Sequence, residues 1–191
     1  MASGTRERIM DVALRLFGEQ GVAATPVTAI ESAAGLSAGS GSFYRHFKDK
    51  KALLAAVVER EMERVRKNPA AQISRTHGTP AEALATQLLA DLDFLRELKP
   101  LIAILMWERG RAPEVGRQVR EVMVQRGVEL GVADLLLTTP VAPAEEDPAA
   151  AATVMMCAMV GYFLNTEYFG EAPGDVAAGR FTSSLARLLV R

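Results

Sequence analysis

The residues of this chain with the clearest chemical potential lie together in GLSAGSGSFYRHFKDKKALL, at residues 35–54. This stretch combines small and hydroxyl side chains with an aromatic pair and a group of Arg, His and Lys. A glycine loop that binds a nucleotide phosphate normally follows a strand and carries Gly-Lys-Ser/Thr or G-x-G-x-x-G. Here the preceding element is an expected helix, and Gly39-Ser40-Gly41 has no adjacent lysine. The stretch therefore argues against a nucleotide site and leaves a flexible loop or a DNA-reading surface.

Catalytic and metal-binding patterns are poor elsewhere in the sequence. His46 and His77 lie in separate segments, and neither has a metal-ligand spacing with Cys157 or with a carboxylate. Asp91 and Asp93 are two residues apart, so they cannot face each other on one helix. Cys157 lies in an apolar run without a basic neighbour, which favours a buried structural thiol over a redox sensor. We expect no enzyme activity, no metal and no cofactor.

The charge distribution favours a basic N-terminal region. Residues 1–67 hold 11 Lys and Arg against 8 Asp and Glu, whereas the remainder holds 11 against 15. A mildly basic region on an acidic body suits contact with a polyanion. The overall composition, with 49% hydrophobic and 24% charged residues, is that of a globular protein of one or two domains.

Hydrophobic spacing predicts helices along the whole chain. Ile9, Val12, Ala13, Leu16 and Phe17 follow the spacing of a one-faced helix that Gly21 would end. No stretch alternates with period two between turn signals, so an all-α fold is expected. The further expected helices cover 27–34, begun by Thr25-Pro26; 50–67, capped by Asp49; 80–98, with a Thr79/Glu82 capping box; 101–110; 113 to about 137; 151–164; and a last one from Asp175.

The first short helices suggest a DNA-binding arrangement. A helix over residues 27–34, a turn at Gly35 and a second short element ending in Phe43-Tyr44 would form a helix-turn-helix. Small side chains over residues 37–42 would let the second element approach the major groove closely. The basic and aromatic residues behind it would then contact the DNA backbone.

Residues 5–55 also resemble the DNA-binding domain of the TetR (tetracycline repressor) family of bacterial transcriptional regulators. The likeness rests on LFGEQGVAATPVTAI, on the turn AAGLS and on FYRHFKDKKALL, which is similar to the family's aromatic-Tyr-x-x-Phe-x-x-Lys-x-x-Leu pattern. The resemblance implies phosphate contacts from Thr25, Tyr44, His46 and Lys50. It implies contacts to bases or their phosphates from Ser37, Ser40 and Ser42.

Two features depart from the family pattern. The span from Gly35 to Tyr44 is about two residues longer than in the commonest members, so the reading helix could begin at Ser37 or at Ser40. Position 31 is Glu where the family usually has a small residue, and we expect it at the rim or repelling phosphate. No long base-reading side chain lies within residues 37–42, which favours shape readout and backbone contacts.

The resemblance implies a helical ligand-binding and dimerisation domain over residues 51–191, after a DNA-binding domain over residues 1–50. The expected helix over residues 151–164 has more apolar surface than one core needs, and the last helix has an apolar face. Together these helices are consistent with a four-helix dimer interface, although core helices of a monomer are the alternative. The expected interface residues are Met156, Val160, Phe181, Leu185, Leu188 and Leu189. The expected ligand-binding residues are Leu92, Leu95, Met106, Trp107, Met123, Met159, Tyr162 and Phe163, whose apolar character favours a lipophilic effector.

The uncharged run over residues 148–166 needs a membrane check. Its length is near that of a spanning helix, but it is rich in Ala, Gly and Thr and has acidic flanks. We expect a helix buried in protein on all faces, no membrane, no secretory signal and a cytoplasmic location.

These features together predict a ligand-responsive transcriptional regulator. It would be a repressor that binds a palindromic operator in double-stranded DNA as a homodimer and is released by a small lipophilic effector. The alternatives are a helical protein–protein adaptor and an apolar-ligand carrier without DNA binding.

Overall fold

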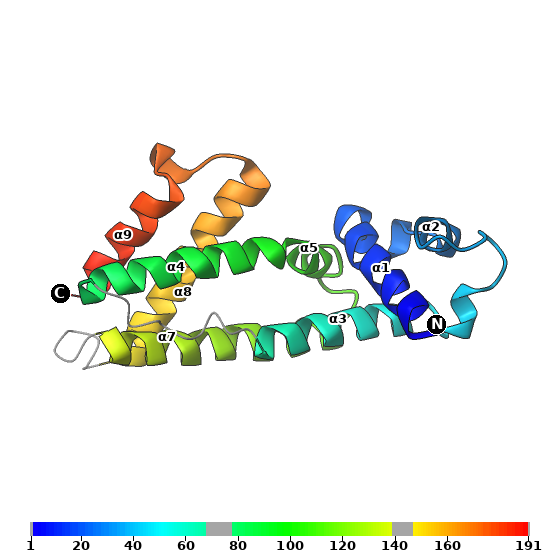
Figure 1. The fold of residues 1–191 in the computed structure, drawn as a ribbon, viewed down its shortest axis with the longest axis horizontal. Coiled ribbons are helices and arrows are strands. Elements are labelled where there is room, and N and C mark those ends of the chain that lie inside the picture. The colour runs from blue at the N-terminus through cyan, green and yellow to red at the C-terminus, as the bar shows by residue number, and fades with distance from the viewer. Residues whose placement is uncertain (1, 68–77, 139–146, 191) are drawn as a thin grey trace. The chain divides into compact units, whose positions relative to one another are not determined.

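The computed structural model describes residues 2–67, 78–138 and 147–190, and the regular elements of these residues are all helical (Figure 1). This confirms the predicted all-α fold. The α-helices are α1 (Ala2–Ala24), α2 (Val27–Ala33), α3 (Lys50–Arg66), α4 (Pro80–Glu97), α5 (Lys99–Trp107), α6 (Pro113–Arg120), α7 (Arg126–Thr138), α8 (Pro148–Leu164) and α9 (Ala178–Leu189). Shorter elements are η1 (Phe43–Arg45), η3 (Glu121–Gln125), η5 (Asn165–Phe169) and η6 (Pro173–Asp175).

The chain forms two compact units whose boundaries differ from the predicted division at residue 50. The first unit comprises Met1–Arg66 and Leu98–Glu121, and the second comprises Lys67–Glu97 and Val122–Arg191. Helix α3 and the later helices α5 and α6 therefore group with the N-terminal helices. The functional division into a DNA-binding and a ligand-binding domain stays a prediction.

The first unit is built around α1, which packs against α2, α3 and α5. Its predicted apolar stripe is buried at Ile9, Ala13 and Phe17, because these positions fall on one face of the helix. Gly21 interrupts the helix with a φ of 79°, a left-handed value that glycine adopts without steric cost. The predicted stop at Gly21 is therefore seen as a break in helical geometry, three residues before α1 ends.

Polar contacts hold α3 in the first unit. The Arg60 guanidinium lies 3.2 Å from a Glu7 carboxylate oxygen and 2.7 Å from one of Asp11, which ties α3 to α1. At the start of α3, the Ala52 N–H donates to Asp49 Oδ1 at 2.7 Å. The predicted Asp49 cap is confirmed, and it satisfies one of the amides that a helix N-terminus leaves without a helical partner.

The second unit contains α4, α7, α8 and α9, with α4 in contact with each of the other three. The predicted stripe of α4 is buried at Leu84, Leu88 and Leu92. The predicted capping box is present as well: the Thr79 N–H donates to Glu82 Oε2 at 2.7 Å, and the Glu82 N–H donates to Thr79 Oγ1 at 3.3 Å. Figure 1 shows α8 and α9 joined through the short turn that contains η6.

The long helix expected from Pro113 to about residue 137 is not uniform. Residues 113–138 are helical throughout, but Glu121–Gln125 forms a π-helical stretch between α6 and α7. Such insertions are rare because they add a residue to the helical turn. Hydrophobic periodicity predicts the helix but does not reveal this extra residue.

Helix α8 is less buried than expected. In the described residues one stretch, Pro148–Phe169, has the length and apolar composition of a membrane span, and 28% of its most apolar window is buried. The prediction of a helix buried on all faces is therefore wrong for the single chain. The exposed side chains include Val154, Cys157 and Val160, which repeat every three residues along one face. The expectation of a buried Cys157 thiol is therefore wrong for the single chain.

Candidate nucleic-acid interface

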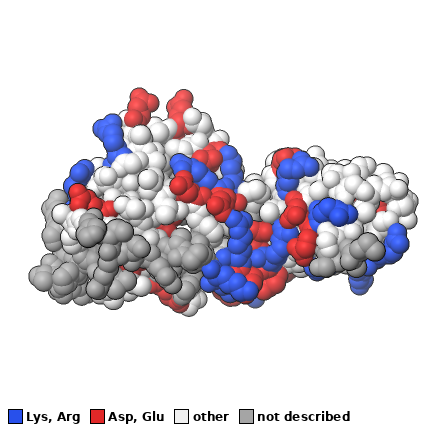
Figure 2. Space-filling view, viewed as in Figure 1, with Lys and Arg blue, Asp and Glu red and all other residues white. Residues whose placement is uncertain are grey.

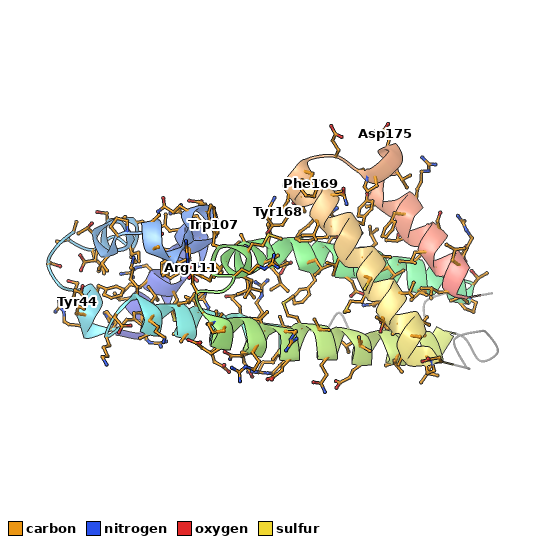
Figure 3. All side chains as sticks on the ribbon, turned by 180° about the vertical axis from the view of Figure 1, so that it is seen from behind. Tyr44, Trp107, Arg111, Tyr168, Phe169 and Asp175 are labelled. Carbon is orange, nitrogen blue, oxygen red and sulfur yellow. The ribbon has the colours of Figure 1, made fainter. Side chains whose placement is uncertain are left out.

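An aromatic anchor places the residues expected to meet DNA. Phe43 and Phe47 are buried beneath η1 with their ring centroids 6.0 Å apart, and the Arg6 guanidinium lies 4.9 Å from the centroid of the Phe47 ring. Tyr44 lies between them in sequence and is 62% exposed; Figure 3 shows it projecting outward from η1. The short helical turn thus buries two rings and presents the third, with its hydroxyl, to solvent.

The second element of the predicted helix-turn-helix is the short 3-10 helix η1, and no α-helix forms over residues 37–42. Residues 37–42, here called the reading segment, follow α2 as turns and bends before η1 begins. Gly39 and Gly41 have φ values of 75° and 71°, which a right-handed helix cannot include. The alternation of Gly and Ser, with the extra residues in this span, explains why a helix is not favoured here. An α-helix therefore begins neither at Ser37 nor at Ser40.

The expectation that Glu31 lies at the rim or repels phosphate is wrong. Its side chain is buried, with 1% of the residue exposed. Oε2 accepts the Gly39 N–H at 2.8 Å, and Oε1 accepts the Phe43 N–H at 3.0 Å. The carboxylate thus joins α2 to both ends of the 39–43 loop.

The three predicted serines are accessible to different degrees. Ser37 and Ser40 are exposed, and Ser42 is partly exposed. The Ser40 and Ser42 hydroxyl oxygens lie 2.7 Å apart, and the Arg45 guanidinium donates to Ser42 Oγ at 2.9 Å. The reading segment therefore presents two linked hydroxyls beside a guanidinium, a set that can donate hydrogen bonds to phosphate or base oxygens.

Thr25 does not lie where a duplex could reach it in this structure. It is fully buried, and its hydroxyl donates to the Gly21 carbonyl oxygen at 2.8 Å and accepts from Gln20 Nε2 at 3.2 Å. Residue Pro26 takes the cap position of α2 without a side-chain cap. The expected cap and phosphate contact of Thr25 are therefore corrected to a role at the junction of α1 and α2.

Lys50 is also engaged within the chain. Its ammonium donates to the carbonyl oxygens of Val22 at 2.7 Å, Ala23 at 3.3 Å and Thr25 at 2.9 Å. An ammonium has three donors, so these contacts account for all of them. The phosphate contact of Lys50 stays a prediction that would require these bonds to be exchanged.

Arg45 and Lys48 were not among the predicted site residues. Both are exposed, next to the exposed Tyr44, while the predicted His46 is partly buried. Both residues lie within the aromatic motif FYRHFKDKKALL, and this position was the signal that could have identified them. In Figure 2, Lys and Arg atoms are spread over the N-terminal helices among largely uncharged surface. The arrangement can bind a polyanion through a few cations and hydroxyls.

Comparison with known proteins agrees with this geometry. The sequence profile of the bacterial regulatory proteins of the tetR family matches residues 9–57, which include the buried face of α1, the reading segment and the start of α3. The chain is 34% identical over 110 residues to the uncharacterized HTH-type transcriptional regulator YerO of Bacillus subtilis, covering 54% of this chain and 35% of that protein. It is 48% identical over 58 residues to the HTH-type transcriptional regulator AcrR of Shigella flexneri, covering 30% and 26%.

Residues 9–57 of this chain therefore match the tetR family of bacterial regulatory proteins. The matched part spans about a third or less of the length of these curated relatives. The fold extends further: the chain matches the crystal structure of a TetR transcriptional regulator from Chloroflexus aurantiacus with a TM-score of 0.73 and 24% identity, over 99% of this chain and 96% of that one. The relatives are transcriptional regulators and not enzymes, as the sequence predicted.

The predicted ligand-binding residues are divided between the two units of the chain. Leu92, Met159, Tyr162 and Phe163 are buried in the second unit, which also contains the partly exposed Leu95 and Met123. Met106 and Trp107 belong to the first unit. The Trp107 indole N–H donates to the Gly18 carbonyl oxygen at 3.1 Å. Trp107 thus fastens α5 to α1, and its assignment to the same ligand site as the second-unit residues is not supported.

The predicted dimer residues also have unequal exposure. Val160 and Leu188 are exposed, and Met156 and Leu189 are partly exposed. Leu185 is buried within the chain, and Phe181 stacks on Tyr162 with ring centroids 4.3 Å apart. Phe181 therefore links α9 to α8 within one chain and Leu185 is buried in the second unit, while Val160 and Leu188 remain available to another surface.

Proposed function

We propose that this protein is a DNA-binding transcriptional regulator that represses genes from a palindromic operator. The observation that carries the proposal is the TetR-family match over residues 9–57. The surface built on this stretch supports it: an outward Tyr44, exposed Arg45 and Lys48, and a hydroxyl-rich reading segment above a buried aromatic anchor. These groups suit the phosphate backbone and the groove edges of a duplex.

The protein acts as a homodimer in this proposal. One reading surface makes few contacts, and a two-fold dimer that meets two half-sites, about 34–36 Å apart, increases both affinity and specificity. The exposed face of α8, with Val154 and Val160, and the exposed Leu188 of α9 support this, because apolar surface gains free energy when a partner covers it. A palindromic operator follows from the two-fold symmetry.

A small lipophilic effector releases the DNA in this proposal. The second unit supplies adaptable Met and aromatic side chains from α8, including Met159, Tyr162 and Phe163. An effector that binds one conformation of the dimer more tightly shifts the population toward it. In that conformation the distance between the two reading surfaces no longer matches the distance between the half-sites. The repressor then leaves its operator and transcription resumes. These events take place in the cytoplasm, where the DNA is.

Selection from random duplexes tests the DNA-binding function. The full chain is mixed with random double-stranded DNA, and the bound fraction is sequenced over several rounds. We expect a palindrome to be enriched and its affinity to fall steeply as salt rises, because phosphate contacts release counterions. An adaptor or an apolar-ligand carrier would enrich no sequence, and that outcome would refute the proposal.

A further inference from the structure

The buried carboxylate of Glu31 is the most specific contact of the candidate interface. Its two oxygens accept backbone N–H groups from Gly39 and Phe43, at 2.8 and 3.0 Å. A buried carboxylate is expensive unless hydrogen bonds satisfy it, and here the bonds come from the loop and not from a basic side chain. One side chain of α2 therefore fixes the positions of both ends of the 39–43 loop.

The other hydrogen bonds of this loop join residues that are two to four positions apart in the sequence. The Ser42 N–H donates to Ser40 Oγ at 3.3 Å, and the Tyr44 N–H donates to the Gly41 carbonyl oxygen at 3.1 Å. Gly39 and Gly41 both have positive φ and open space around the position of a Cβ. Without the regular bonds of a helix, the backbone has little intrinsic preference for one conformation. The Glu31 bonds thus tie this loop to α2, in addition to the burial of the Phe43 ring at its end.

We propose that Glu31 is a positioning residue for DNA recognition. It holds the 39–43 loop in the conformation in which Ser40, Ser42 and Tyr44 meet the duplex, and so sets sequence specificity without touching DNA. The inference rests on the proposed DNA-binding function. It also explains together the two departures from the family pattern, which are the longer span from Gly35 to Tyr44 and the glutamate at position 31. The longer span contains the backbone N–H groups that Glu31 binds.

The chemistry requires a carboxylate of this length. A glutamine at position 31 retains one oxygen acceptor but places an NH₂ donor against the second backbone N–H, so one of the two bonds is lost. An aspartate retains both oxygens on a side chain that is shorter by one methylene, so it cannot reach both amides without a shift of the backbone. Glu31→Gln and Glu31→Asp therefore weaken the same link in different ways.

The test compares Glu31→Gln and Glu31→Asp with the wild-type chain and with Glu19→Gln. Glu19 is an exposed residue of α1 that pairs with Arg15 at 3.3 Å, so its substitution removes the same charge from the first unit without touching the loop. Amide hydrogen exchange is measured at Gly39 and Phe43, and the affinities for the selected duplex and for a scrambled duplex are measured at one salt concentration.

In Glu31→Gln we expect exchange at Gly39 and Phe43 to accelerate roughly tenfold or more while amides of α1 keep their protection. The ratio of affinities for the selected and scrambled duplexes should fall roughly tenfold, as for the loss of a correct base contact. Glu31→Asp should also show faster exchange and a lower affinity ratio, and Glu19→Gln should match the wild type in both measurements.

The outcomes separate this inference from the function on which it rests. If the wild-type chain selects no sequence, the proposed function fails, whereas the exchange data still report on the Glu31 bonds. Faster exchange with unchanged discrimination would overturn Glu31 as a positioning residue, as would unchanged exchange. Loss of folding in both Glu31 variants would assign the residue to overall stability and would also overturn it.

Discussion

The two units of this protein use their unusual residues in opposite ways. In the first unit, Glu31 and Lys50 turn inward and bind backbone groups, which shapes a surface that then faces solvent. In the second unit, apolar Val154 and Val160 turn outward from α8. A buried charge needs partners within the chain, whereas an exposed apolar face gains from a partner outside it. The charged groups Glu31 and Lys50 of the first unit thus have their partners within the chain, whereas the exposed apolar face of the second unit is suited to association with another protein surface.

The largest expected effect tests whether the aromatic anchor supports the first unit. Phe43→Ala removes a fully buried ring and should lower the free energy of unfolding by about 3–5 kcal/mol. DNA binding should be lost with the fold of the reading surface. The neighbouring Tyr44→Ala is the control: it should change stability by about 0.5 kcal/mol or less, yet weaken binding to all duplexes alike. Urea unfolding and DNA titrations measure both; equal stability of the two variants would contradict the anchor.

The next prediction concerns the outward face of the second unit. Val160→Arg places a charge on the proposed dimer surface, and burying an unpaired charge costs several kcal/mol, so we expect a monomer in sedimentation experiments and roughly 100-fold weaker operator binding. Val124→Arg is a matched control, because Val124 is 44% exposed and Val160 38% exposed in the same unit. If both variants sediment as dimers, the dimer surface lies elsewhere.

A third prediction separates the structural role of Lys50 from a direct DNA contact. Lys50→Ala leaves the carbonyl oxygens of Val22, Ala23 and Thr25 without their cation and should lower the free energy of unfolding by about 1–3 kcal/mol. Lys48→Ala removes an exposed lysine and should leave stability unchanged while weakening binding to all sequences. Unchanged stability in Lys50→Ala, with binding reduced as in Lys48→Ala, would assign Lys50 to the DNA backbone.

The smallest expected effect concerns two carboxylates of the second unit. Burial raises the pKa of Asp91 to about 6, although a hydrogen bond from Gln87 opposes the shift. Burial and the nearby Asp91 charge raise the pKa of Asp134 to about 7. Because both folded pKa values lie above the unfolded value of 3.8, the folded chain binds more protons, and stability should fall as pH rises from about 4 to 7.

Asp91→Asn tests this pH dependence. The variant should lose part of the decline in melting temperature and be more stable than wild type at pH 8 by about 1 kcal/mol, since it removes a charge from a buried site. Thermal melts of both proteins at pH 5 and pH 8 provide the measurement, with Asp93→Asn, an exposed position on the same helix, as the control. A wild-type melting temperature that rises between these two pH values would contradict the assignment.

Much of the fold was predictable because its signals are local. The apolar stripes of α1 and α4, the break at Gly21, the Asp49 cap and the Thr79–Glu82 box each depend on residues a few positions apart. Tyr44 and the serines were accessible to the same reasoning, since the aromatic motif that positions them is contiguous. Arg45 and Lys48 were missed although they lie in that motif.

The sequence by itself determined that this chain is helical, that it carries the TetR-family motif, and that its reading segment lacks long base-reading side chains. Only the tertiary structure decided the inward role of Glu31, the burial of Thr25 and the engagement of Lys50. It also decided which face of α8 stays exposed. The reason is physical: helix periodicity and capping act over one or two turns, whereas the burial of a charge and the exposure of a face depend on groups that folding brings from distant parts of the chain.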